Sequence, residues 1–215
     1  MKTGKWIFGC LAIAAAVGVG MGCASTGYNK AGTTVTALDN SAKAIVRGNM
    51  LIDETLVKLN DLVYNPSSNL LVQFKSFEKS VNELGATVND VGAKSNDMKA
   101  QGAAYFADWD QKMAKMKNED IRHRSEARNK EVSARFDRIS KHYDEVNAAF
   151  APYMSDLHDV QSALSVDLTS GGLSSVKDAV GKAKDHAAPL KKTIEKLSSE
   201  FEEIGLSMSA EMSRQ

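Results

Sequence analysis

Four long stretches of the sequence place apolar residues at alternating spacings of three and four, and this pattern constrains the fold more than any other feature. The stretches run from Val35 to Val63, from Leu70 to Trp109, from Val132 to Leu164 and from Leu173 to Met208. A repeat that averages about 3.5 residues keeps one apolar stripe facing a neighbouring helix, as in left-handed coiled coils. We therefore predict an all-α fold, an elongated antiparallel coiled-coil bundle of long helices.

Turn residues separate the stretches and set the expected helix bounds. Asn65-Pro66-Ser67 follows the first stretch, and Thr169-Ser170-Gly171-Gly172 follows the third. The expected helices span about residues 33–64, 67–116, 118–168 and 173–213, within one coiled-coil domain of residues 33–215. Small or polar residues interrupt the apolar stripes at four positions, where we expect a local loss of stability: Asn49, Ser95, Gly102 and Ala187.

The apolar pattern lapses between Met116 and Val132, and its phase changes there. Acidic residues four positions before basic ones, such as Asp120 with Arg124, still favour helix in this segment. Two arrangements fit: a straight rod with a stutter in the repeat, or a tip at which the chain folds back near Lys117–Glu119. The absence of glycine and proline between Gly102 and Pro152 favours the straight rod.

The N-terminal residues have the organisation of an export signal. Lys2 and Lys5 precede an uncharged apolar segment from Trp6 to Met21. The following residues, 19–25 (VGMGCAS), resemble the lipobox of bacterial lipoproteins, except that Gly20 stands where leucine is usual. We predict a signal peptide over residues 1–22, lipidation of Cys23, and a flexible tether over residues 23–32.

Lipidation of Cys23 predicts the location of the protein. The resemblance implies a covalent diacylglycerol and an N-acyl chain on Cys23, and we expect no other cofactor. Two or more acyl chains anchor a protein stably, whereas one binds only marginally. Ala24 stands where inner-membrane lipoproteins of enteric bacteria carry aspartate, which implies the outer membrane of the cell envelope, facing the periplasm. The alternative is an uncleaved anchor helix over residues 6–22.

A basic segment lies in the region where the apolar pattern lapses. Between residues 112 and 141, ten Lys and Arg residues stand against five Asp and Glu residues. One interpretation is an ordinary solvated helix face. The other is a contact site for an anionic partner, held away from the membrane anchor, and its candidate residues are Arg122, Arg124, Arg128 and Lys130.

The sequence carries little that points to catalysis, metal binding or nucleic-acid binding. Lys plus Arg and Asp plus Glu are equal at 27 each, so no excess positive charge is available for a nucleic-acid backbone. Asp120 and His123 have the spacing of one half of a di-metal motif, but no second half is present. We expect no metal site, no catalytic residues and no nucleic-acid partner.

Several segments of the third and fourth stretches resemble a bacterial family of coiled-coil proteins of unknown function, many of which have lipoprotein signals. The likeness is carried by Phe150–Leu157, Leu164–Thr169 and Gly171–Gly172. It implies the fold and an envelope location, as for other DUF-type envelope proteins. We expect a structural or adaptor lipoprotein whose partner is an envelope protein or a second copy. The alternatives are a ligand-binding or enzymatic bundle, and a self-assembling membrane-associated protein.

Overall fold

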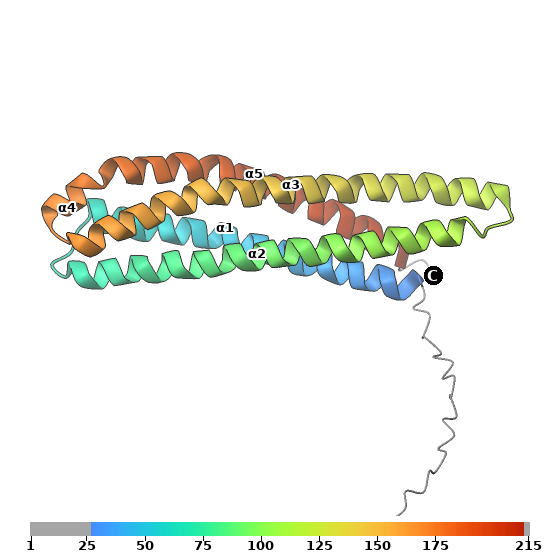
Figure 1. The fold of residues 1–215 in the computed structure, drawn as a ribbon, viewed down its shortest axis with the longest axis horizontal. Coiled ribbons are helices and arrows are strands. Elements are labelled where there is room, and N and C mark those ends of the chain that lie inside the picture. The colour runs from blue at the N-terminus through green and yellow to red at the C-terminus, as the bar shows by residue number, and fades with distance from the viewer. Residues whose placement is uncertain (1–26, 213–215) are drawn as a thin grey trace, which may run out of the picture.

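The chain forms an elongated bundle of antiparallel helices (Figure 1). The computed structural model describes the backbone of residues 27–212 and the side chains of residues 30–204. The helices of this part of the chain are α1 (Gly27–Tyr64), α2 (Leu70–Met113), α3 (Glu119–Val166), the short α4 (Ser170–Ser175) and α5 (Lys177–Met212). The predicted all-α bundle is confirmed.

The bundle core is built from the apolar stripes. Helix α1 packs along α2 and along α5, while α3 packs along α5 and α2. The stripe residues Ile45 and Ile52 of α1, Phe77 of α2 and Tyr143 of α3 are fully buried in one continuous core. Large apolar side chains fill the space between the helices, so the bundle has a packed interior along most of its length, except at the turn between α2 and α3.

Capping side chains define where the helices begin. Asn69 precedes α2 and accepts a hydrogen bond from the amide of Val72 at 3.2 Å. Asn118 does the same for α3, with the amide of Ile121 at 3.1 Å. Such caps satisfy amides that have no partner within the helix. Helix α2 therefore begins three residues later than the expected position 67.

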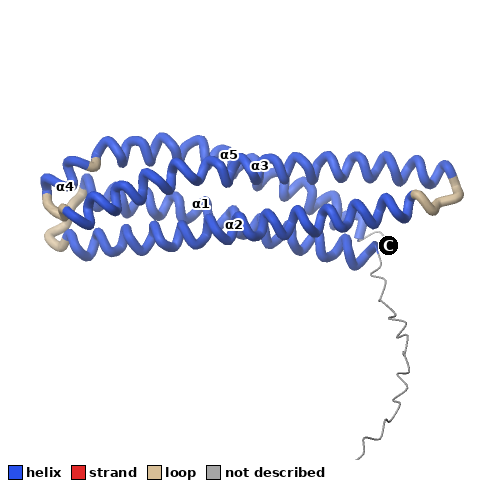
Figure 2. The backbone as a smooth tube through the Cα atoms, viewed as in Figure 1, coloured by secondary structure: helices blue, strands red, loops and turns tan. Residues whose placement is uncertain are grey.

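A turn over residues 114–118 separates α2 from α3, so the chain folds back where the apolar pattern lapses. This is the second of the two arrangements that the sequence left open, and the straight rod is wrong. The turn needs neither glycine nor proline, because Asn118 ends it by capping α3. Figure 2 shows this turn alone at one end of the bundle and the other connections at the opposite end.

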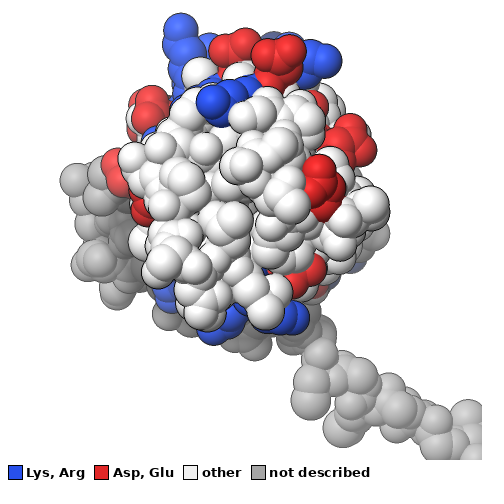
Figure 3. All heavy atoms as spheres, turned by 90° about the vertical axis from the view of Figure 1, so that its left-hand side faces the viewer, with Lys and Arg blue, Asp and Glu red and all other residues white. Residues whose placement is uncertain are grey.

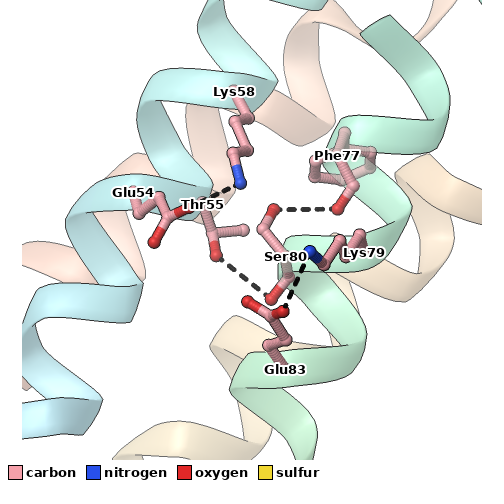
Figure 4. Close-up of polar contacts among 7 residues, drawn as sticks. All are labelled: Glu54, Thr55, Lys58, Phe77, Lys79, Ser80 and Glu83. Carbon is pink, nitrogen blue, oxygen red and sulfur yellow. Dashed lines mark hydrogen bonds and ion pairs between the residues drawn. The ribbon is translucent and has the colours of Figure 1, made fainter. Parts of the chain in front are cut away.

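A second stripe on α1, made of small residues, brings α1 and α2 together. Thr34, Ser41, Gly48 and Thr55 recur every seven residues and are all buried. The hydroxyl of Ser41 donates to the carbonyl of Lys94 at 3.1 Å, and that of Thr55 lies 3.5 Å from the carbonyl of Ser80 (Figure 4). Small side chains let two helix backbones approach closely.

Two tyrosines of α3 reach across to the backbone of α1. The hydroxyl of Tyr143 donates to the carbonyl of Ser41 at 3.3 Å, and that of Tyr153 to the carbonyl of Ile52 at 3.4 Å. Both side chains are fully buried. Burial raises the pKa of both phenols well above its ordinary value, because the interior disfavours the charged phenolate.

Candidate interaction surfaces

The α2–α3 hairpin extends beyond the first turn of α1. Figure 1 shows its tip projecting past both the start of α1 and the end of α5. The ammonium of Lys30, near the start of α1, pairs with the carboxylate of Asp108 at 3.1 Å. Asp108 also pairs with Lys112 at 2.7 Å, and these two lysines lower the pKa of its carboxyl. The residues after Asp108, up to the turn and back along α3, form what we call the hairpin tip, residues 109–130.

An aromatic cluster holds the two helices of the hairpin tip together at its base. The ring of Trp109 lies 5.5 Å from that of Tyr105, and Phe106 packs edge-on against Phe136 at 5.6 Å. The indole N–H of Trp109 donates to the hydroxyl of Ser125 on α3 at 2.8 Å. Contacts of this kind between α2 and α3 fix the tip without help from the other helices.

The predicted contact residues Arg122, Arg124, Arg128 and Lys130 all lie on the α3 side of the hairpin tip. Arg124 and Lys130 are exposed, whereas Arg122 and Arg128 are half-buried. Arg122 lies 3.6 Å from Glu126, and Arg128 lies 3.0 Å from Glu131. The structure therefore places the four residues on one segment. Arg124 and Lys130 are available at the surface, whereas Arg122 and Arg128 form ion pairs within the helix.

Two further cations of the tip, Lys115 and Lys117, were not among the predicted contact residues. Both lie in the turn and are exposed, and neither forms an ion pair with another residue of the described part of the chain. They were missed because a turn at this point was not the favoured interpretation. The lapse of the apolar pattern at Met116 was the signal that could have identified them.

The position of the tip relative to the start of the bundle differs from the prediction. The basic segment was expected to lie away from the membrane anchor. Helix α1 begins at Gly27, four residues after Cys23, and it begins at the end of the bundle from which the tip projects. The fold-back at residues 114–118 reverses the chain and produces this arrangement. Cys23 itself lies outside the described residues.

The opposite end of the bundle carries few charges. Figure 3 views the molecule from that end and shows a broad area without Lys, Arg, Asp or Glu, with charged side chains around its rim. Exposed apolar side chains belong to this end: Leu71 and Val72 at the start of α2, and Val166 at the end of α3, which is 89% exposed. We call this surface, with the connection over residues 65–69, the distal end.

The distal end was also missed from the sequence, because its apolar residues do not follow the stripe spacing of the core. Leu71 and Val72 directly follow the stripe residue Leu70 and therefore face away from the core. A run of three apolar residues at a helix start was the available signal. Exposed apolar groups at one place are typical of interaction surfaces.

The interior offers no obvious catalytic constellation among the described residues. A groove of about 480 Å³ lies between α1 and α5, lined mainly by apolar residues such as Val35, Val46 and Phe201. Among the described side chains, no group of three or more His, Cys, Asp or Glu residues is placed to hold a metal ion. His123 lies 3.4 Å from Glu126. No helix in the described part of the chain combines the length and apolar character needed to cross a bilayer.

Comparison with known proteins gives one match. Residues 22–205 match the model of a family described as a protein of unknown function (DUF2959). Neither the curated proteins nor the solved structures contain a significant match.

Proposed function

Because the chain belongs to the DUF2959 family, whose function is unknown, we propose a function from the geometry of this member: a lipid-anchored structural or adaptor protein of the bacterial envelope. In this proposal Cys23 carries the lipid in the outer membrane, and the helical bundle projects into the periplasm. The bundle holds its distal end away from the membrane and presents it to a partner, which is an envelope protein or a second copy.

The observation that carries the proposal is the short distance along the chain between Cys23 and the bundle. Only residues 24–26 separate Cys23 from the start of α1. The ion pair between Lys30 and Asp108 places Asp108 of α2 level with the start of α1, and the N-terminus of α2, Leu70, lies at the distal end. The distance along α2 from Asp108 to Leu70 therefore measures how far the distal end lies from the start of α1. At 1.5 Å per residue this distance is about 60 Å. A lipid on Cys23 would thus position the distal end several tens of ångströms from the membrane surface.

The packed interior and the sparsely charged distal end favour an adaptor over an enzyme. Enzymes and ligand carriers usually have a concave site with a few convergent polar groups. The groove between α1 and α5 is open and lined mostly by apolar side chains, and its residue Asp39 pairs with Lys43 of the same helix at 2.6 Å. The exposed apolar residues of the distal end instead resemble the centre of a protein interface.

The anchor is tested by replacing Cys23 with serine and feeding cells a palmitate analogue. We expect Cys23→Ser to lose the label and to leave the membrane fraction or accumulate as precursor, because serine cannot form the thioether. Cys10→Ser is the matched control and should be labelled like the unchanged protein. Retained label and membrane association in Cys23→Ser would contradict the anchor and favour the uncleaved helix.

The adaptor role is tested with a photo-crosslinking residue at Val166 of the distal end. We expect one dominant adduct from this position, and its mass distinguishes a second copy from another protein. Ala151, exposed in the middle of α3, is the control position. Identical adducts from both positions, or none from Val166, would contradict a specific partner at the distal end.

A further inference from the structure

We propose that the hairpin tip is a membrane-contacting surface that binds anionic phospholipid headgroups of the same membrane in which Cys23 is anchored. The proposal rests on the proposed lipidation of Cys23. It adds a second attachment point, so that the bundle is held upright on the membrane instead of hanging on its tether.

The first step of the argument is the charge of the tip. The hairpin tip, residues 109–130, contains seven Lys and Arg residues against four acidic residues. Lys115, Lys117 and Arg124 are exposed and form no ion pair with other described residues. Two of the acids, Glu119 and Asp120, lie in the first turn of α3, where negative charge stabilises the helix N-terminus.

The tip differs from the basic residues farther along α3, which have acidic neighbours. Arg135 and Arg138 line a small pocket together with Glu200 and Glu203 of α5. In Figure 1 the hairpin tip projects past the end of α5, away from these acids. The charges of Lys115, Lys117 and Arg124 are therefore left for a partner outside the bundle, and anionic lipid headgroups attract clusters of this kind.

An exposed apolar side chain adds to the charge. Ile121, in the first turn of α3, is 57% exposed and stands next to Arg122. An apolar residue among basic ones at an exposed turn is suited to the boundary between headgroups and acyl chains. A soluble polyanion offers no apolar surface against which Ile121 could pack. This residue therefore favours a lipid surface.

The segment from Cys23 to Gly27 is long enough to permit both attachments at once. The expected tether over residues 23–32 is shorter than predicted, because α1 begins at Gly27. The turn at Met116 lies eight residues beyond Asp108, and therefore about 10 Å beyond the first turn of α1. Cys23 lies four residues before Gly27, and an extended chain spans up to about 3.5 Å per residue, or about 14 Å. The lipid on Cys23 and the hairpin tip can thus reach one membrane surface together.

The test uses the full lipidated protein, purified and reconstituted in vesicles, with a fluorescent label at a single introduced cysteine. Met116→Cys places the label at the tip, and Ser68→Cys places it at the distal end as a control. The vesicles contain phosphatidylcholine alone or mixed with phosphatidylglycerol, and both contain a quencher attached to the lipid headgroup. We expect quenching of the Met116 label only with phosphatidylglycerol, reversal by salt, and no quenching of the Ser68 label.

A charge variant shows whether the basic residues cause the contact. In the triple variant Lys115→Gln, Lys117→Gln, Arg124→Gln we expect the equilibrium constant for contact between the tip and the vesicle surface to fall by on the order of a hundredfold, because three cations near an anionic surface are lost. The matched control is Lys75→Gln, Lys182→Gln, Lys192→Gln, which removes the same charge from exposed positions outside the tip. The Met116 label on this control variant should be quenched as strongly as on the protein with the native charges.

Three results would overturn the proposal. Equal quenching of both labels would mean that the bundle lies flat or moves freely, and equal quenching in both kinds of vesicle would mean that charge is not involved. An unquenched Met116 label on protein that floats with the vesicles would reject the tip contact while leaving the anchor intact. If Cys23 carries no acyl chain and the protein does not float, the proposed function fails first, and the flotation assay records this separately.

Discussion

Replacing Gly102 with alanine tests the packing of the bundle where α2 meets α3. Gly102 is buried, and a Cβ atom added there would lie 2.1 Å from the Cζ atom of Phe136, with two further ring atoms within 2.8 Å. The ring of Phe136 occupies the space that the missing side chain leaves. In Gly102→Ala the ring must move, although Phe106 already packs against it.

The expected magnitude follows from two opposing effects. Alanine is favoured over glycine inside a helix by about 0.5–1 kcal/mol. Forcing extra volume into a packed core costs about 1–3 kcal/mol. We therefore expect Gly102→Ala to lower the free energy of unfolding by up to about 2.5 kcal/mol. Gly92, in the same helix, has open space around an added Cβ, and Gly92→Ala should raise the free energy of unfolding by up to about 1 kcal/mol.

Urea unfolding followed by circular dichroism measures both changes, because the free energy falls linearly with urea concentration. The difference between the two variants isolates the ring contact, since the propensity gain is common to both. Adding Phe136→Leu to Gly102→Ala should recover part of the loss. If Gly102→Ala were as stable as Gly92→Ala, the close approach of Phe136 to Gly102 would be wrong.

Two further predictions concern other buried positions. The folded protein keeps the protons of Tyr143 and Tyr153 at pH values where the unfolded chain loses them, because burial raises their pKa. The free energy of unfolding should be constant below about pH 10 and should fall above it, by up to about 1.4 kcal/mol per pH unit for each tyrosine. The double variant Tyr143→Phe, Tyr153→Phe should lose this dependence on pH, as measured by urea unfolding at alkaline pH. An unchanged slope would show that other groups cause the alkaline loss. In Gly172→Ala the added Cβ would lie 1.9 Å from the carbonyl oxygen of Asp167, so we expect a loss of about 2–3 kcal/mol in the free energy of unfolding, and a neutral result would contradict the tight turn before α4.

The apolar core of the bundle was predictable from the sequence because hydrophobic spacing determines which helix face is buried. Ile45, Leu59, Leu84 and Leu157 were placed on the stripes by counting alone, and all four are fully buried. The helix bounds follow less well. Asn69 and Asn118 begin their helices through side-chain hydrogen bonds, and a single asparagine is a weak signal in the sequence.

The small-residue stripe of α1 was not predicted, because Thr34, Ser41, Gly48 and Thr55 carry little hydrophobic signal. Their role depends on α2, whose carbonyl groups accept hydrogen bonds from Ser41 and Thr55. Only the seven-residue spacing of small residues could have indicated it. Gly102 shows the same limit: its position in the apolar stripe predicts a weak point, but the ring of Phe136 makes it a close contact.

The positions of the candidate surfaces depend on whether the chain continues straight or folds back after α2, and the sequence does not specify this. Arg124 and Lys130 were identified by composition, and both are exposed. The fold-back at residues 114–118 decides that they lie at the end of the bundle where α1 begins. A spacing pattern sets which residues share a helix face, but it does not say whether a long charged segment continues or reverses. Their position relative to Cys23 therefore required the structure.

The most direct test of the lipid anchor is the mass of the protein extracted from membranes, combined with sequencing of its N-terminal peptide. A lipoprotein would lack residues 1–22 and would carry the added mass of a diacylglycerol and an N-acyl chain on Cys23. That is the result we expect. A protein that retains Lys2 and Lys5 and has an unmodified Cys23 would contradict the anchor, and with it the placement of the distal end and the hairpin tip relative to the membrane.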